Sequence, residues 1–338
     1  MCFFLKFTAI YHMTFLFYLK EMPVGILQTL LETFILFFYT FTLLTIATSR
    51  EKVFRSAFYI LFISTGIVDI MSLLFCFVLR LNSELGLSRE YRYVILYSIA
   101  AGRAMLTAHM LGNAFITFNR YSSICLMHKY NKIWTQRNVF IIIAIQYGVS
   151  IAAVAYIAKS NVLYTQSEDG TYKFRGLDPN VAMITGSIAL IIGIVCLVTS
   201  LGMNVKLFVK WRILLKNRDS STGRHAEKGL LMYIITAFTL MMIMSIEDVL
   251  FAVSSATANY ELFTWVNDRV FWMNDFMVTV PPLSLTFLSA DLRHAILKIF
   301  LKAQSPILVT PVSHAFRGGV QRTTTEAQSH RRTTVHLS

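Results

Sequence analysis

Seven long apolar stretches, almost free of charged residues, follow one another along this 338-residue chain. An α-helix rises 1.5 Å per residue, so about 20 such residues cross the ~30 Å hydrocarbon layer of a bilayer. Spanning segments must satisfy their backbone hydrogen bonds as helices or as a closed barrel, and the lack of period-two alternation excludes the barrel. The sequence therefore predicts an all-α membrane protein, a seven-transmembrane helix bundle. We expect the spans at residues 24–48, 57–79, 93–126, 139–158, 181–208, 229–255 and 262–288.

The composition supports lipid as the solvent of this chain. Hydrophobic residues make up 55% of the sequence and charged residues 14%, which is too apolar for a soluble domain whose surface faces water. The formal charge of +13 would suit nucleic acid, but the basic residues lie in short runs beside the apolar stretches. That pattern sets membrane orientation. We therefore expect a lipid bilayer as a partner and no nucleic acid.

Lysines and arginines collect on alternate connections between the spans. Twenty of the 31 follow the first, third, fifth and seventh spans, whereas nine lie on the opposite side. Basic connections stay in the cytoplasm. The asymmetry predicts a multi-pass plasma-membrane protein with its amino terminus outside and its carboxyl terminus inside.

Three regions are expected along the chain. Residues 1–23 form an extracellular segment whose apolar part, 1–19, suits a weak signal, an anchor or an interfacial helix. Residues 24–301 form the membrane domain, and its last part, 291–301, is amphipathic and suits a short helix on the inner leaflet, with a plain solvated tail as the alternative. Residues 302–338 are polar, basic and rich in threonine, which predicts a disordered tail open to phosphorylation.

Ionisable side chains inside the spans are costly in lipid and mark functional candidates. Arg103 lies ~15 Å along the third span from its outer end, at the depth of Glu247 and Asp248 in the sixth. We expect Arg103 to pair with one of these acids, either as a structural salt bridge or as part of a ligand pocket. The ionisable residues within spans are Glu32, Asp69, Arg103, Glu247, Asp248 and Asp275.

The seventh span carries two indoles and two carboxylates on one helical stripe, because they are spaced three, four and three residues apart. Such a stripe suits the wall of an outward-opening cavity, although a row of Trp also suits packing or the interface belt. The stripe consists of Trp265, Asp268, Trp272 and Asp275. The expected pocket residues are Arg103, Glu247, Asp248, Asp268, Trp272 and Asp275.

Polar residues also occur near the middle of the membrane. Asp69 in the second span and Asn274 with Asp275 in the seventh are expected to form a cluster that holds water or a cation. His109 stands alone in the third span, and we expect a packed or hydrogen-bonded helix residue there. No metal site or cofactor is expected, because the histidines and cysteines lack ligand spacing.

Asn119-Arg120-Tyr121 ends the third span at the inner face, and Trp134 closes the run His-Lys-Tyr-Asn-Lys-Ile-Trp that follows. The position of the first motif resembles the Asp/Glu-Arg-Tyr site of G-protein-coupled receptors. The longer run resembles the nematode serpentine chemoreceptors, closest to class V within the class gamma superfamily. The resemblance covers residues 24 to about 301.

The resemblance implies a chemosensory receptor, without catalysis, that binds a small-molecule cue in an outer cavity and engages a heterotrimeric G protein at its inner face. The sensory cilium is one candidate location. In the larger family the Arg matching Arg120 is released on activation and reaches the G protein. The expected coupling residues are Arg120, Asn119, Tyr121, Lys129, Lys132, Trp134, Lys210, Arg212 and Lys216. For the basic connection 206–228, contact with anionic lipid alone is the alternative.

The chain departs from the wider receptor pattern at several positions. Asn119 replaces the acid, so a protonation switch is not available there, and residues 229–255 contain no Pro. Pro281 and Pro282 stand in place of the Asn-Pro motif, and their missing helix hydrogen bonds predict a kink and a hinge.

Two other functions are weighed against the receptor. A small transporter or channel would line its path with the intramembrane charges, but transporters usually show paired repeats, and the two halves of this chain share no similarity. A membrane enzyme would need converging nucleophiles or metal ligands, which the scattered histidines do not provide.

Overall fold

The computed structural model describes residues 24–85, 89–166, 172–216, 221–257 and 260–304. The expectations for 1–23 and for the tail from 305 onward lie outside these residues. The chain divides into two compact units, Met1–Lys298 and Ile299–Ser338. The first unit holds the helix bundle.

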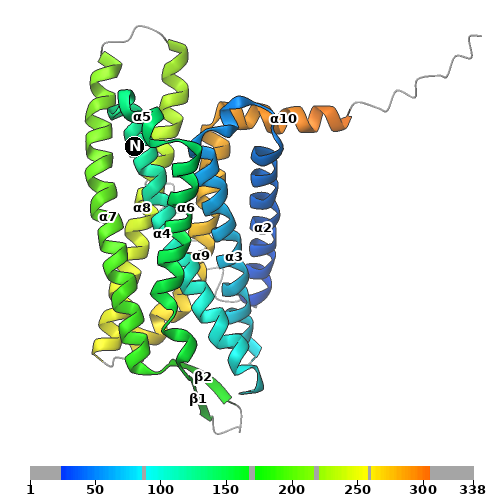
Figure 1. Ribbon diagram of the computed structural model, residues 1–338. Helices are drawn as coiled ribbons and strands as arrows, with labels where there is room; N and C mark the ends of the chain where they lie inside the picture. Colours follow the sequence, from blue (N-terminus) through cyan, green and yellow to red (C-terminus); the bar gives the residue numbers. More distant parts are fainter. Residues whose placement is uncertain (1–23, 86–88, 167–171, 217–220, 258–259, 305–338) are drawn as a thin grey trace, which may run out of the picture. The chain divides into compact units, whose positions relative to one another are not determined.

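In the part of the chain that the structure describes, seven long helices form the bundle, and the prediction of an all-α membrane fold is confirmed (Figure 1). Within the described residues, six helices are long and apolar enough to cross a membrane. The seventh, α9, falls short by composition because it carries Asn274, Asp275 and two prolines. The helices are α2 (Val24–Thr48), α3 (Ala57–Leu85), α4 (Arg92–Cys125), α6 (Gln136–Val154), α7 (Pro179–Lys216), α8 (Ser221–Ala256) and α9 (Tyr260–Leu288).

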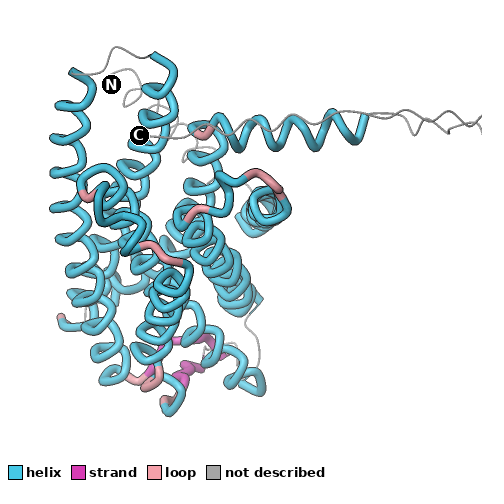
Figure 2. The backbone as a smooth tube through the Cα atoms, turned by 45° about the horizontal axis from the view of Figure 1, so that its top comes forward, coloured by secondary structure: helices cyan, strands magenta, loops and turns pink. Residues whose placement is uncertain are grey.

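Shorter elements mark the two ends of the bundle. A β-hairpin of β1 (Val162–Gln166) and β2 (Tyr172–Leu177) joins α6 to α7 and lies at one end, here called the hairpin end. Gly176 sits in β2 with φ 126°, a conformation that side chains disfavour. At the opposite end, called the α5 end, lie α5 (Met127–Ile133) and the start of α10 (Ala290–Gln304) (Figure 2).

The outward face of the bundle is apolar, as lipid requires. In α2, Ile26, Phe34 and Phe37 are 64%, 63% and 72% exposed, while Ile35 and Tyr39 are buried. A helix that is hydrophobic on both its inner and its outer face belongs in a membrane or in the core of a large protein. The exposed faces of α6 and α7 follow the same pattern.

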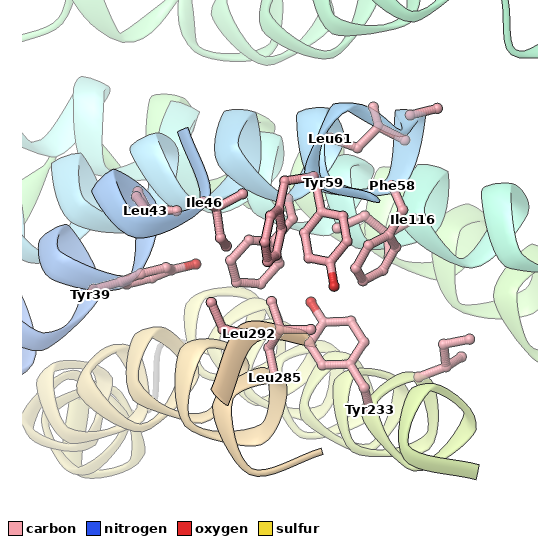
Figure 3. Close-up of a cluster of buried hydrophobic side chains, with 14 of the residues drawn as sticks. Tyr39, Leu43, Ile46, Phe58, Tyr59, Leu61, Ile116, Tyr233, Leu285 and Leu292 are labelled. Atoms are coloured by element: carbon pink, nitrogen blue, oxygen red, sulfur yellow. The ribbon is translucent and has the colours of Figure 1, made fainter. Parts of the chain in front are cut away.

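Helix α4 runs through the centre of the bundle, where it contacts α3, α6, α7 and α8. The largest group of buried apolar side chains draws on all seven long helices and on α10, and its aromatic part lies between α3 and α8 (Figure 3). Phe58 is central to it, with ring centroids 5.0 Å from Tyr59 and 5.9 Å from Tyr233 in edge-on geometry. Edge-on aromatic pairs stabilise beyond their buried area. Leu292 of α10 is fully buried against this group, so the amphipathic segment after the last span is a packed helix at its start.

Candidate functional site

Arg120 is held in an aromatic cage at the α5 end of α4. Its guanidinium carbon lies 3.7 Å from the centroid of the Phe58 ring, and its Nε is buried without a hydrogen-bond partner. The phenols of Tyr59 and Tyr233 interact electrostatically with the same charge, and their hydroxyls point toward each other from α3 and α8 (Figure 3). In the described part of the chain no acid lies within salt-bridge distance of Arg120. A cation–π contact stabilises a desolvated cation by about 2 kcal/mol, which is less than a buried carboxylate provides.

The neighbours of Arg120 connect α4 to α5. Asn119 is fully buried and its Nδ2 donates to the Tyr130 hydroxyl at 3.3 Å, so it turns away from Arg120. Trp134 is 8% exposed and its Nε1 donates to the Ser122 Oγ at 2.5 Å. Trp134, which the sequence assigned to the coupling surface, thus anchors the α5–α6 turn to α4. Tyr121 is half-buried.

The predicted basic residues at this end lie on two different surfaces. Lys210 and Arg212 are exposed on α7, and Arg212 lies over the Phe208 ring at 4.7 Å. Lys216 ends α7, and its side chain lies outside the described ones. Lys129 and Lys132 instead line a pocket between α5 and α6.

A buried polar chain crosses the middle of the bundle. Asp69 is fully buried, and its Oδ2 accepts from the Tyr39 hydroxyl at 2.6 Å while its Oδ1 lies 2.5 Å from His109 Nδ1. The other ring nitrogen of His109 lies 2.7 Å from Asn113 Nδ2. His109 is therefore hydrogen-bonded, as expected, and the network links α2, α3 and α4. Buried networks of this kind fix the relative position of helices when their members are satisfied.

The predicted cluster of Asp69, Asn274 and Asp275 is divided between separate hydrogen bonds. Asn274 accepts from Ser72 Oγ at 2.7 Å, and Asp275 accepts from Gln28 Nε2 at 2.7 Å. Ser72 follows Asp69 by one turn of α3, so the polar groups lie on neighbouring levels. Asn274 Nδ2 and Asp275 Oδ1 remain buried without a hydrogen-bond partner. Such groups are costly to leave unpaired and suit a bound polar ligand or water.

A second ion pair joins α2 to α3 nearer the hairpin end. Arg80 Nη2 lies 2.5 Å from Glu32 Oε2 and its Nε lies 3.2 Å from Oε1, with side chains 3% and 6% exposed. Arg80 also donates to Thr29 Oγ1 at 2.9 Å and to the carbonyl oxygen of Gly25 at 3.3 Å. The sequence placed Arg80 in an outer connection, because it lies just beyond the predicted end of the second span. The helix in fact continues to Leu85, which brings the guanidinium inside.

Arg103 pairs with Asp248, one of its two expected partners. Its Nη1 lies 3.4 Å from Asp248 Oδ1, and its guanidinium lies 4.7 Å from the Phe251 ring centroid. Asp248 Oδ2 and Glu247 Oε2 are buried without a hydrogen-bond partner. The pair is thus loose, and two carboxylate oxygens beside it are open to a further donor.

The stripe on α9 faces more than one environment. Trp265 is 53% exposed, Trp272 is half-buried and Asp275 is buried. The side chain of Asp268 lies outside the described ones. Glu32, Arg103 and Asp275 lie near Cys76 of α3, so charged groups of α2, α4 and α9 lie near one level of α3. Among the described residues there is no cluster of His, Cys, Asp and Glu that could hold a metal.

Comparison with known families gives one result over most of the chain. The family described as serpentine type 7TM GPCR chemoreceptor Srv matches residues 28–301. This span covers α2 from Gln28 onward, the other six long helices in full and most of α10. A search of curated proteins finds no match.

Proposed function

Because this chain belongs to the Srv family of serpentine seven-transmembrane chemoreceptors, we propose that it binds a small chemical cue among the charged groups near the hairpin end and activates a heterotrimeric G protein at the α5 end. The proposed orientation places the hairpin outside the cell and the α5 end in the cytosol, as the basic connections require. In this proposal the helix bundle has two conformations. The cue and the G protein each bind one conformation more tightly than the other, so binding of the cue favours binding of the G protein.

The observation that carries the proposal is the cage around Arg120. The Arg120 guanidinium lies over Phe58 with its Nε unpaired, and among the described residues no acid lies within salt-bridge distance of this charge. The charge would gain hydrogen bonds if it moved out to a polar partner at the cytosolic end. Asn119 bonds to Tyr130 and does not restrain it. The cage thus supports a switch held by aromatic contacts rather than by an ion pair.

The cue site is proposed at the level of Arg103, Glu247, Asp248 and Asp275, together with Trp272 and Asp268. Three of these acids keep a buried oxygen without a hydrogen-bond partner. Buried polar groups of this kind are the ones that a polar ligand can satisfy. Two hydrogen bonds join α9 at this level to its neighbours. Gln28 of α2 donates to Asp275, and Ser72 of α3 donates to Asn274.

The test is cue-evoked signalling in cultured cells that express the full chain with a G protein and a calcium reporter. A panel of small organic acids, amines and short peptides serves as the probe set. Arg120→Ala is expected to abolish the response while surface expression is retained. Arg55→Ala is the matched control. Arg55 is exposed at the same end of the bundle, and its replacement by Ala removes one positive charge, as Arg120→Ala does.

The outcomes separate the receptor from its main alternative. An undiminished response of Arg120→Ala would remove the assigned role of Arg120. Ion current evoked by the panel without any G protein would favour a channel, in which the same intramembrane charges line the path. A Phe58→Leu form should raise basal signalling, because it opens the cage and leaves the guanidinium in place.

A further inference from the structure

A pocket opens between α5 and α6 at the α5 end, away from the cage around Arg120. Its volume is about 650 Å³. Its walls combine two kinds of side chain, lysines from α5 and isoleucines from the α5–α6 corner and α6. The lining residues are Lys129, Lys132, Ile133, Asn138, Ile141 and Ile142. We call it the α5–α6 pocket.

Local hydrogen bonds fix the shape of the pocket. Asn138 Nδ2 donates to the carbonyl oxygen of Ile133 at 2.9 Å, and the Asn138 backbone N–H donates to Thr135 Oγ1 at 3.3 Å, which caps α6. Trp134 holds the corner against α4 through Ser122. The two helices therefore keep their relative position without a ligand, and the pocket is largely preformed.

The pocket runs from the membrane interface into the hydrocarbon layer. Asn138 lies in the first turn of α6, and Ile141 and Ile142 follow one turn deeper, about 5 Å along the axis. The face of α6 beside them is apolar and open, with Phe140, Ile141 and Ile145 exposed at 56%, 46% and 50%. This face belongs to a membrane-spanning helix. A soluble partner does not reach such a surface, whereas an acyl chain lies against it.

The charges at the rim favour an anion. Lys129 and Lys132 are exposed, and neither has an acid within salt-bridge distance in the described part of the chain. Two lysines without an acid partner in the described part of the chain therefore line the same pocket as Ile133, Ile141 and Ile142. A phospholipid has the complementary arrangement, with a charged head group above apolar chains.

We propose that the α5–α6 pocket binds one anionic glycerophospholipid. The phosphate and head group lie between Lys129 and Lys132, and one acyl chain lies over Ile141 and Ile142. The proposal takes from the proposed orientation that the α5 end faces the cytosol, where the leaflet is rich in anionic lipid. It moves Lys129 and Lys132 from the G-protein surface to a lipid site.

The test uses the purified full-length chain in nanodiscs of phosphatidylcholine with a minor fraction of phosphatidylserine. Native mass spectrometry after mild delipidation measures how much of each lipid stays bound. Two lysines near an anionic head group should strengthen binding by about 30-fold together, so K129Q/K132Q should lose that preference for phosphatidylserine. The double variant K206Q/K210Q is the matched control, since both lysines are exposed on α7 at the same end.

A third variant tests the apolar part. Ile141→Trp fills the slot at a half-exposed position, where the larger ring is accommodated without disturbing the core. It should release phosphatidylserine although both lysines remain. Retained phosphatidylserine in Ile141→Trp would overturn the proposal, because the lipid would then be held by surface charge alone.

Two further results would also overturn it. An equal loss in K129Q/K132Q and K206Q/K210Q would show a general attraction of the basic end for anionic lipid. Unchanged lipid binding in K129Q/K132Q, with slower nucleotide exchange on a purified G protein in pure phosphatidylcholine, would return the lysines to the G-protein surface. The lipid measurement needs neither cue nor G protein, so its failure is distinct from failure of the receptor proposal.

Discussion

Gly112 marks the tightest approach in the bundle that a single substitution can test. A Cβ placed there would lie 2.3 Å from Thr65 Oγ1 and 2.8 Å from Gln146 Nε2, so α3 and α6 both press against α4 at this residue. Gln146 has little room to move, because its Nε2 donates to the carbonyl oxygen of Ala108 at 2.8 Å. Thr65 is also buried. We therefore expect Gly112→Ala to force the helices apart.

The magnitude follows from two opposing effects. Overpacking a close-packed core costs about 1–3 kcal/mol, and a shift of Gln146 adds about 1 kcal/mol for its hydrogen bond. Replacing a helical Gly by Ala returns about 1 kcal/mol through propensity. Gly112→Ala should thus lower the free energy of unfolding by about 1–3 kcal/mol.

Gly148→Ala in α6 provides the control for this prediction. No atom lies within 4 Å of a Cβ at Gly148, so only the propensity gain remains, and the variant should be as stable as the parent or up to about 1 kcal/mol more stable. Unfolding of the purified variants in detergent, followed by circular dichroism and by tryptophan fluorescence, measures both. Equal stability of Gly112→Ala and Gly148→Ala would refute the close packing of α3, α4 and α6.

Two further predictions concern the polar interior, and a third concerns a proline of α9. Glu32→Gln should destabilise the protein by about 3–5 kcal/mol because it leaves Arg80 buried without its acid, and a double-mutant cycle with Arg80→Gln that shows no coupling would contradict the ion pair. Asp69→Asn should cost about 1–3 kcal/mol, since an amide cannot accept from both Tyr39 and His109, and unchanged thermal stability would argue against the network. Pro281→Ala should stiffen α9, because it removes one of the two prolines inside the helix, and should reduce cue-evoked signalling at unchanged surface expression, whereas full signalling would show that no hinge is used there.

Most of the fold could be predicted from the sequence, because every segment that crosses lipid must be apolar and must satisfy its backbone hydrogen bonds, here as a helix. The first span was predicted at residues 24–48, and α2 covers the same residues. The fifth span was predicted at 181–208, whereas α7 continues to Lys216. A helix can continue beyond the hydrocarbon layer, whereas a run of apolar residues identifies only the part of the helix inside that layer. The β-hairpin and α5 could not be predicted in this way, because connections outside the lipid are not required to be apolar or helical.

One ion pair near the proposed cue site could be predicted, because depth alone decides it. Arg103 and Asp248 could be matched because both lie at a similar distance from the outer face. The partners of Asp69 could not, since hydrogen bonds to Tyr39 and His109 depend on how each helix is rotated about its axis. Arg80 was missed for another reason, because an arginine just past an apolar stretch suits a loop as well as a continuing helix.

The central claim is that the three long helices α7, α8 and α9 cross the membrane between the hairpin and the tail, leaving Arg120 at the cytosolic end. One epitope inserted between β1 and β2 and another after Ser338 test it directly in cells. We predict that antibody reaches the hairpin epitope on intact cells and the tail epitope after permeabilisation alone. Detection of both epitopes on the same side, or of the tail on intact cells, would contradict the account.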